Sequence, residues 1–273
     1  MKYIFLSLAA LAVIFGISFL ITGIIRKKLK KKPPFGVHIL ISIVAGLLVI
    51  CGAFFVYVGI HYSADDEVLA VWAESGSVQV TEIDGAYMID GEGEDTALVF
   101  YPGAKVDSEA YLPLMKKLAE NGIDCFLLKS PMRIAIFDMN AAERIIEKYD
   151  YHTWLLSGHS MGGIAAAGCA AENSDAVDGV VLLASYPNQA LPDDISLLSI
   201  YGSEDKVLEL DAYENAKENY PPNSQEIVIE GGNHAQFGNY GKQSGDGEAT
   251  ITREEQQEKT VAAILDFVKK YHL

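Results

Sequence analysis

The sequence predicts an α/β fold with a mainly parallel sheet, preceded by two membrane-spanning helices. Three observations lead to this prediction. From residue 78 onward, apolar strand-like runs alternate with helical segments, which is the pattern of βαβ units. Two long uncharged runs stand at the N-terminus. All 37 acidic residues lie at or after Asp65, so the two parts of the chain also differ sharply in charge.

The two N-terminal runs, Tyr3–Ile25 and Val37–Ile60, are 23 and 24 residues long. At a rise of about 1.5 Å per residue, each helix spans a hydrocarbon core of about 30 Å. A cleaved signal peptide is the alternative for the first run, but its apolar region is usually about 7–15 residues long. Here the run ends in the basic segment Arg26–Lys32, and Pro33-Pro34 breaks any helix that continues through it.

The basic segment also predicts the topology. Positive charge beside membrane helices stays in the cytoplasm, so everything after Ile60 is expected outside. We therefore expect a two-pass protein of the cell membrane, with an anchor at 1–62 and an extracytoplasmic domain at 63–273. That domain holds 14 basic and 37 acidic residues, a net charge of −23. Such a charge argues against nucleic acid as a partner.

The elements of the second part follow a connector at 61–77. Two strands, 78–84 and 86–92, are predicted to form a hairpin around the Asp84-Gly85 turn. The later strands are apolar throughout, as expected when helices cover both faces of a sheet; they are placed at 96–101, 123–129, 153–157, 179–185, 197–202 and 225–230. Helices are expected at 107–121, 138–149, 161–172, 210–220 and 253–270, with Asp107 as the N-cap of the first.

Ser160 stands in a G-x-S-x-G pattern within the segment WLLSGHSMGGIAAAG. The pattern is short, but here an apolar strand precedes it and a small-residue helix follows. A strand-turn-helix elbow of this kind exposes a serine nucleophile in a strained backbone conformation. Gly158 and Gly162 remove side chains that would clash in such a turn. The competing interpretation is that Ser160 is a plain helix N-cap.

A nucleophilic serine needs a base, and the base needs an acid that orients it. In the elbow arrangement the chain order is Ser, then Asp or Glu, then His. The segments SIYGSEDKV and IEGGNHAQFG supply Asp205 and His234, each after an apolar strand. In open parallel sheets, binding and catalytic sites lie at the edge formed by the C-terminal ends of the strands. Glu204 competes with Asp205, which has the better spacing from the preceding glycine, and a plain loop histidine is the alternative for His234.

Two backbone N–H groups are expected to stabilise the developing oxyanion, those of Met161 and of Ala104 in the loop FYPGAKVD. Lys105 in the same loop either attracts an anionic substrate or is a solvated surface charge, and we favour the second interpretation. His159 precedes the serine and is expected to point away from the site. The long loop 231–247 is expected to be functional or mobile, and its Phe237 and Tyr240 either line the site or anchor the loop.

The chain has three cysteines, Cys51, Cys125 and Cys169, and their spacing is irregular. They predict neither a disulfide framework nor a metal site, and we expect all three to be buried apolar residues. No phosphate-binding glycine motif is present, so no cofactor is predicted.

Taken with these residues, the segments YPGAKVDSEAY, GHSMGG, LLASYP, SIYGSED and EGGNHAQFGNYGKQSGDG resemble the α/β-hydrolase superfamily over about 63–273. Within it, the chain is similar to the fold-5 group, which is related to dienelactone-hydrolase-like proteins and is often membrane-anchored in Gram-positive bacteria. The resemblance implies a sheet of about eight strands and a triad of Ser160, Asp205 and His234, but no substrate. Two departures stand out: dienelactone hydrolases have a cysteine nucleophile, and the usual His-Gly of the oxyanion loop is Pro102-Gly103 here.

The sequence therefore predicts a membrane-anchored, carboxylesterase-like serine hydrolase that cleaves an ester or related acyl bond through an acyl-enzyme. Its expected partners are a small acyl substrate and, for the N-terminal helices, the lipid bilayer. An envelope acyltransferase with the same triad and a non-catalytic binding protein on a hydrolase fold are the alternatives. Only about ten residues separate Ser185 from Ile195, which is too few for a helical lid.

Overall fold

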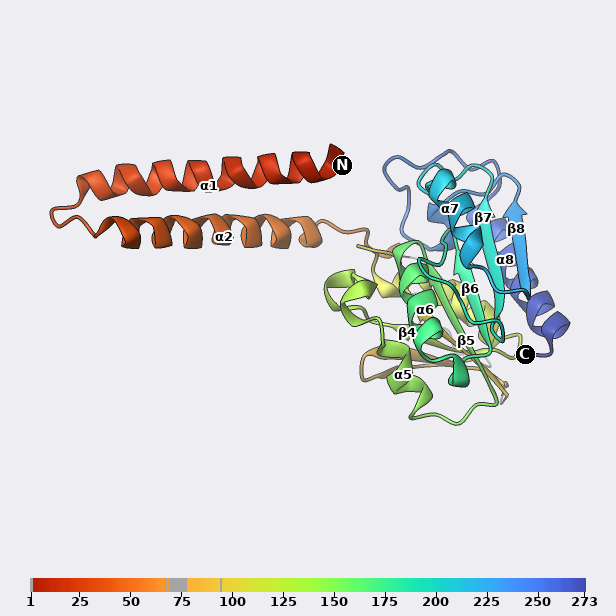
Figure 1. The fold of residues 1–273 in the computed structure, drawn as a ribbon. Coiled ribbons are helices and arrows are strands. Elements are labelled where there is room, and N and C mark those ends of the chain that lie inside the picture. The colour runs from red at the N-terminus through yellow and green to blue at the C-terminus, as the bar shows by residue number, and fades with distance from the viewer. Residues whose placement is uncertain (1, 67, 69–77, 94) are drawn as a thin grey trace. The chain divides into compact units, whose positions relative to one another are not determined.

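The computed structural model describes residues 2–66, 68, 78–93 and 95–273 (Figure 1). Most of the predicted connector, residues 67 and 69–77, lies outside the described residues. The chain divides into two compact units, Met1–Ile60 and His61–Leu273, which are described separately below.

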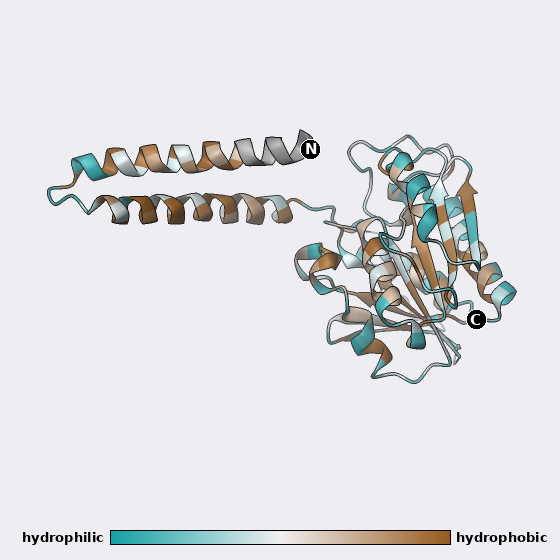
Figure 2. Cartoon of the chain, viewed as in Figure 1, coloured by the Kyte–Doolittle hydropathy of each residue, from teal (hydrophilic) through white to brown (hydrophobic). Residues whose placement is uncertain are grey.

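The first unit is a hairpin of two helices, α1 (Lys2–Lys28) and α2 (Phe35–Gly59). Pro34 directly precedes α2, as expected from the Pro-Pro break. The stretches Ala10–Lys28 and Phe35–Gly59 have mean hydropathies of 1.8 and 2.9 and are long and apolar enough to cross a membrane. Figure 2 shows apolar residues along the coloured part of α1 and along α2, and hydrophilic residues near the loop that connects them.

Polar contacts join the two helices of the hairpin. The hydroxyl of Thr22 lies 2.6 Å from that of Ser42 and 3.1 Å from Nε2 of His38. Hydrogen bonds of this kind are common between helices in apolar surroundings. Cys51 is exposed on α2, so the expectation of a buried thiol is wrong there, because the side chain faces outward from an apolar helix; Cys125 and Cys169 are buried as expected.

The second unit is built on one eight-stranded sheet with the order β1-β2-β4-β3-β5-β6-β7-β8. β1 (Gln79–Ile83) and β2 (Ala86–Asp90) form the predicted hairpin, in which Gly85 takes a φ of +77°. β2 is also antiparallel to β4, and every later pairing is parallel. The parallel strands are β3 (Thr96–Tyr101), β4 (Asp124–Leu128), β5 (Thr153–His159), β6 (Gly179–Leu183), β7 (Ser196–Gly202) and β8 (Ser224–Ile229).

Helices cover the sheet so that each face has its own apolar core. α4 (Leu112–Ala119) and α8 (Arg253–Tyr271) contribute to one core, and α5 (Ala141–Ile146) and α6 (Met161–Glu172) contribute to the other. Side chains of β3 alternate between them, with Leu98 in the first core and Val99 in the second. α7 (Leu210–Ala216) follows β7 (Figure 1). Short 3₁₀ turns complete the chain at Ser108–Tyr111, Pro131–Arg133, Ala135–Asp138, Ser174–Ala176, Lys217–Asn219 and Ala235–Phe237.

Two helices start later than the sequence predicts, because tertiary contacts engage the residues that would begin them. The carboxylate of Asp107 forms an ion pair with Arg133 and caps no helix, so a 3₁₀ turn precedes α4. The hydroxyl of Tyr101 donates to the carbonyl of Met139 and accepts from the N–H of Ala142. α5 therefore begins only at Ala141 and is half as long as expected.

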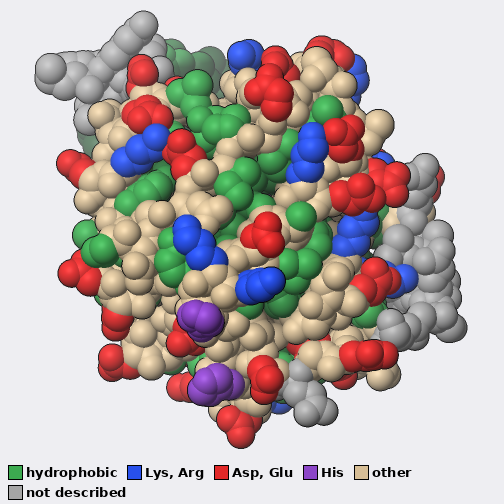
Figure 3. Space-filling view, turned by 90° about the vertical axis from the view of Figure 1, so that its right-hand side faces the viewer, with side chains coloured by type: hydrophobic (Ala, Val, Ile, Leu, Met, Phe, Trp, Pro, Cys, Tyr) green, Lys and Arg blue, Asp and Glu red, His purple; other side chains and the backbone are tan. Residues whose placement is uncertain are grey.

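The acidic side chains on the face around β8 and α8 are spread among lysine and arginine side chains (Figure 3). Charge on this face is therefore mixed and does not form a single patch.

Phe267 of α8 has no exposed surface and belongs to the core that also holds Leu155, Val181 and Leu198. Phe267→Ala is expected to lower the free energy of unfolding by about 3–5 kcal/mol, because it leaves a cavity under α8. Urea unfolding of the full chain in detergent, followed by tryptophan fluorescence, measures this loss. Asp266→Ala changes the exposed neighbour and is the matched control; equal stabilities of the two variants would contradict the assignment of Phe267 to the core.

Candidate active site

Ser160 is the single residue between the end of β5 and the start of α6, with φ +54° and ψ −125°. Its N–H donates to the carbonyl of Leu183 at 2.9 Å. Its carbonyl accepts from the hydroxyl of Ser185 at 2.7 Å and from the N–H of Gly163 at 3.0 Å. These bonds hold the strained conformation that the elbow motif predicts. The Ser160 side chain caps no N–H of α6, so the N-cap interpretation finds no support.

Glycines are required on both sides of the elbow. A Cβ at Gly158 would lie 2.4 Å from backbone atoms of Gly162. A Cβ at Gly162 would lie 2.1 Å from the carbonyl oxygen of Tyr101 and 2.4 Å from that of Pro102. The first turn of α6 is therefore packed against the loop that follows β3, which carries Ala104.

Asp205 lies in the turn after β7, and both oxygens of its carboxylate are engaged in hydrogen bonds. Oδ1 accepts the N–H groups of Val207 and Leu208, both at 2.8 Å. Oδ2 lies 2.8 Å from Nδ1 of His234, and both side chains are 1% exposed. The competing carboxylate of Glu204 instead lies 3.4 Å from the Ser203 hydroxyl. The structure thus brings Asp205, and not Glu204, to His234.

His234 stands in the loop after β8. Side chains from farther along the chain accept hydrogen bonds from the backbone of this loop. The carboxylate of Asp246 accepts the N–H groups of Ala235 at 2.9 Å and of His234 at 3.3 Å. The side chain of Gln256, from α8, accepts the N–H of Asn233 at 2.9 Å. Sequence reasoning did not single out Asp246, whose only signal is its place in the glycine-rich loop. These contacts set the position of the imidazole.

Phe237 and Tyr240 anchor this loop and do not line the site. Phe237 is fully buried and Tyr240 is 5% exposed. The Phe237 ring packs 5.7 Å from that of His159, and the Tyr240 ring 6.4 Å from that of Tyr111. Of the two roles left open by the sequence, the structure therefore favours anchoring.

Ser160 and His234 line the same pocket, of 180 Å³. Nδ1 of His234 is engaged by Asp205, and Nε2 is buried without a hydrogen-bond partner among the described residues. The nitrogen left for proton transfer is therefore Nε2. The pocket is lined by Ser160, Met161, Ile164, Ala184, Ser185, Tyr186, Val207, Leu208, Glu209 and His234.

The expected oxyanion donors lie on the two segments that meet at the elbow. Met161 is the first residue of α6, where the helix N-terminus favours negative charge. Ala104 stands between Gly103, whose N–H donates to the Tyr111 hydroxyl at 3.2 Å, and Lys105, whose N–H donates to the Arg133 carbonyl at 2.8 Å. Lys105 is not among the residues that line the pocket.

His159 does not point away from the site, so that expectation is wrong. Its ring packs 4.4 Å from that of His234, and its Nδ1 lies 2.8 Å from the Tyr111 hydroxyl. Side chains alternate along β5, and Leu155 faces the core under α4 and α8, so His159 must face the same side. Burial lowers the pKa of His159 well below its usual value of 6.5, and the neighbouring His234 lowers that pKa further.

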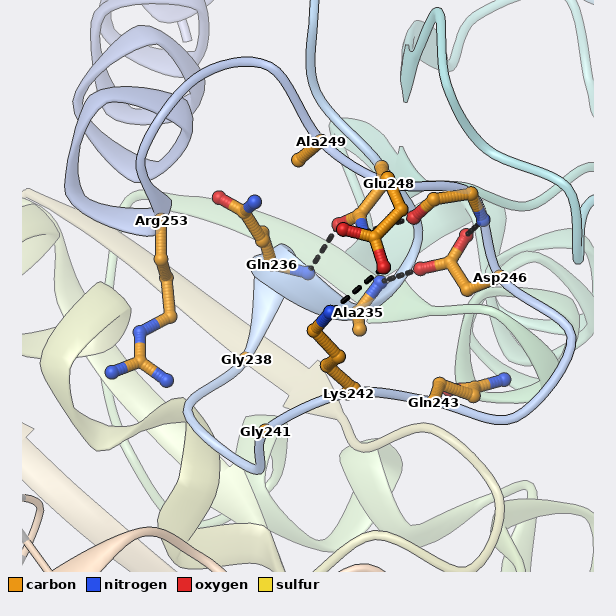
Figure 4. A pocket seen from close by; sticks show the side chains of 12 residues that line it. Ala235, Gln236, Gly238, Gly241, Lys242, Gln243, Asp246, Glu248, Ala249 and Arg253 are labelled. Atoms are coloured by element: carbon orange, nitrogen blue, oxygen red, sulfur yellow. Dashed lines mark hydrogen bonds and ion pairs between the residues drawn. The ribbon is translucent and has the colours of Figure 1, made fainter.

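A second, larger hollow of 360 Å³ lies within the loop that follows His234 (Figure 4). Asp246 and the 2.7 Å ion pair of Lys242 with Glu248 stand on one side of the hollow. Gln236, from the turn after His234, and Arg253, from α8, stand on the other side. Neither Ser160 nor His234 lines this hollow, so it is separate from the pocket described above.

The model of a family described as "Alpha/beta hydrolase family" matches residues 97–258, more than half of the chain. Dienelactone hydrolase from Anabaena variabilis has the same fold, with 14% identity, coverage of 70% of this chain and 99% of that chain, and a TM-score of 0.54. Est1E from Butyrivibrio proteoclasticus matches similarly, with 14% identity, coverage of 71% and 100%, and a TM-score of 0.50.

A curated protein named "Putative non-heme haloperoxidase", from Mycobacterium phage D29, also matches part of the chain. The two are 29% identical over 115 residues, which is 38% of this chain. The chain spans about two fifths of the length of that relative, 41%. The similarity to the two solved structures shows the fold alone.

The neutral, buried state of His159 predicts how stability depends on pH. Above about pH 6.5, His159 is neutral in both the folded and the unfolded chain. Below pH 6.5 the unfolded chain binds a proton that the folded protein excludes, so the free energy of unfolding falls, by up to about 1.4 kcal/mol per pH unit for one group. Urea unfolding at pH values between about 5 and 7.5 measures this slope.

His159→Gln is expected to have a smaller slope than the wild type over this range, whatever its absolute stability. His152→Gln removes an exposed histidine and should keep the wild-type slope. Identical slopes for the wild type and His159→Gln would show that His159 is not held neutral.

Proposed function

Because this chain belongs to the α/β-hydrolase family, we propose that it is a membrane-anchored serine hydrolase that cleaves a carboxylic ester or a related acyl bond. Family membership indicates a hydrolase. The observation that carries the finer proposal is that Ser160 and His234 line one pocket while Asp205 binds the other nitrogen of the imidazole. Ser160 is the nucleophile, His234 the general base and Asp205 the orienting acid.

The first half of the reaction forms an acyl-enzyme. Asp205 accepts the hydrogen bond from Nδ1–H, which leaves Nε2 of His234 unprotonated and able to accept the proton of Ser160. The oxygen of Ser160 attacks the carbonyl carbon as that proton leaves. The N–H groups of Met161 and Ala104 stabilise the oxyanion that develops. His234 then donates its proton to the departing alcohol, and the ester C–O bond breaks.

The second half clears the acyl group from Ser160. His234 takes a proton from water, which attacks the acyl carbon, and then returns the proton to the oxygen of Ser160. Before substrate binds, Nε2 has no hydrogen-bond partner among the described residues. Catalytic hydrogen bonds are often long in the free enzyme and tighten in the substrate complex. Entry of substrate is expected to bring the hydroxyl of Ser160 into line with Nε2.

The N-terminal helices anchor this hydrolase in the membrane, with residues 1–62 as the anchor and 63–273 as the catalytic domain. The length and hydropathy of both helices support this role. The basic segment Arg26–Lys32 favours a cytoplasmic loop, which places the catalytic domain outside the cytoplasm. The substrate is therefore a small molecule of the cell envelope or the surrounding medium.

Labelling by a fluorophosphonate tests both the nucleophile and the topology. We expect a charged, membrane-impermeant fluorophosphonate to label the wild-type protein on intact cells, because an activated serine attacks the probe and the domain lies outside. Ser160→Ala should lose the label, whereas Ser157→Ala, a buried serine of β5, should keep it. Labelling that appears only after lysis would overturn the topology, and no labelling of the folded protein under either condition would overturn the serine mechanism.

Asp205→Asn is expected to lower kcat for p-nitrophenyl acetate by roughly 10³–10⁴-fold, because the amide no longer favours the tautomer with Nε2 free. Glu204→Gln removes the adjacent carboxylate, which does not contact His234, and should leave kcat within about threefold of the wild type. Steady-state kinetics of the purified full chains measures both values. A large loss in Glu204→Gln with little loss in Asp205→Asn would reverse the assignment of the orienting acid.

A further inference from the structure

Among the residues that line the pocket of Ser160, one has an acidic side chain and none is Lys or Arg. This is Glu209, which lies at the N-terminus of α7 and is exposed. It forms no ion pair with any residue that the structure describes. The walls around it are apolar, formed by side chains such as Ile164 and Leu208. Glu209 is thus the only Asp, Glu, Lys or Arg residue in the lining of this pocket.

Glu209 is held in this place by the turn that also supports the base. Oδ1 of Asp205 binds the N–H groups of Val207 and Leu208, and Oδ2 binds His234. Glu209 follows Leu208 directly and has the extended backbone of a helix N-cap residue, while its side chain caps no N–H of α7. The side chain is therefore not engaged by the helix terminus, and Glu209 is among the residues that line the pocket.

The pocket is also small. Its volume is 180 Å³.

We propose that this site selects esters whose small reacting part carries an ammonium group, which Glu209 attracts. This inference rests on the serine-hydrolase function proposed above and names its substrate class. An ammonium group is the complement of a carboxylate that forms no ion pair at the edge of a largely apolar pocket, whereas a carboxylate on the substrate is repelled both by Glu209 and by the net charge of −23 on residues 63–273. The chemistry is unchanged: ester and water give acid and alcohol, with no further reactant.

The test compares esters of matched shape that differ in charge. Alanine ethyl ester, ethyl isobutyrate and monoethyl malonate present a cationic, a neutral and an anionic acyl group. Acetylcholine and 3,3-dimethylbutyl acetate place the same contrast on the alcohol. Hydrolysis by the purified full chain is followed at about pH 7, where the α-amino group is mainly protonated. The measured quantity is the ratio of kcat/KM for the cationic ester to that for its neutral isostere.

We expect wild-type ratios of about tenfold in at least one of the two pairs, and the pair that shows it identifies the side of the ester that occupies the pocket. Glu209→Gln should lower that ratio about fivefold, mainly through KM, and Glu209→Lys should bring it below one and raise the rate on monoethyl malonate. Asp211→Asn removes an exposed carboxylate two residues away that does not line the pocket, and it should leave the ratio unchanged. The effect of Glu209 should shrink at 1 M salt.

The outcomes separate this inference from the function on which it rests. If the wild type hydrolyses the neutral esters and Ser160 is labelled, but the ratios are near one or do not respond to Glu209→Gln, the substrate class is wrong and the hydrolase stands. If no ester is hydrolysed and Ser160 is not labelled, both proposals fail. Retained hydrolysis of the neutral esters by Glu209→Gln verifies that the variant is folded.

Discussion

The hydrogen bonds accepted by the carboxylate of Asp205 are the interaction on which the rest of the site depends. A charge that is almost fully buried is costly unless it is well paired, and Asp205 accepts two backbone N–H bonds and one imidazole bond. One oxygen shapes the turn at Val207 and Leu208, and the other orients His234. The turn that forms one wall of the pocket and the base that lines it are therefore held by the same group.

The elbow at Ser160 places a second constraint on the same edge of the sheet. A positive φ at a residue with a side chain is unfavourable and persists only where surrounding bonds hold it. Here hydrogen bonds with Ser185, Gly163 and the strand residue Leu183 hold Ser160 in this conformation. The glycines around the serine allow α6 to approach the loop after β3 until their backbones touch. The segments that carry the expected oxyanion donors thus meet because of packing that tolerates no Cβ.

His159 links these two constraints. The ring of His159 packs against that of His234. The Tyr111 hydroxyl lies within hydrogen-bond distance of Nδ1 of His159 and accepts the N–H of Gly103, in the loop of Ala104. Buried and neutral, it supports the base without competing with it for a proton. Asp246 supports the loop of His234 by accepting the N–H of Ala235. The catalytic side chains proposed above are thus held in place by neighbours, such as His159 and Asp246, that have no part in the proposed reaction.

The strand sequence along the chain, the α6 helix from Met161 to Glu172 and the elbow around Ser160 could be predicted from the residues alone, because local periodicity and glycine spacing specify them. The residues also limited the orienting acid to two adjacent carboxylates and the base to His234. Four features needed the folded chain: the contact of Asp205 rather than Glu204 with His234, the shortening of α5 by Tyr101, the packing of His159 against His234, and the place of Glu209 in the pocket lining. Those outcomes depend on contacts between segments far apart in the chain, and no local pattern records which side chains such contacts will select.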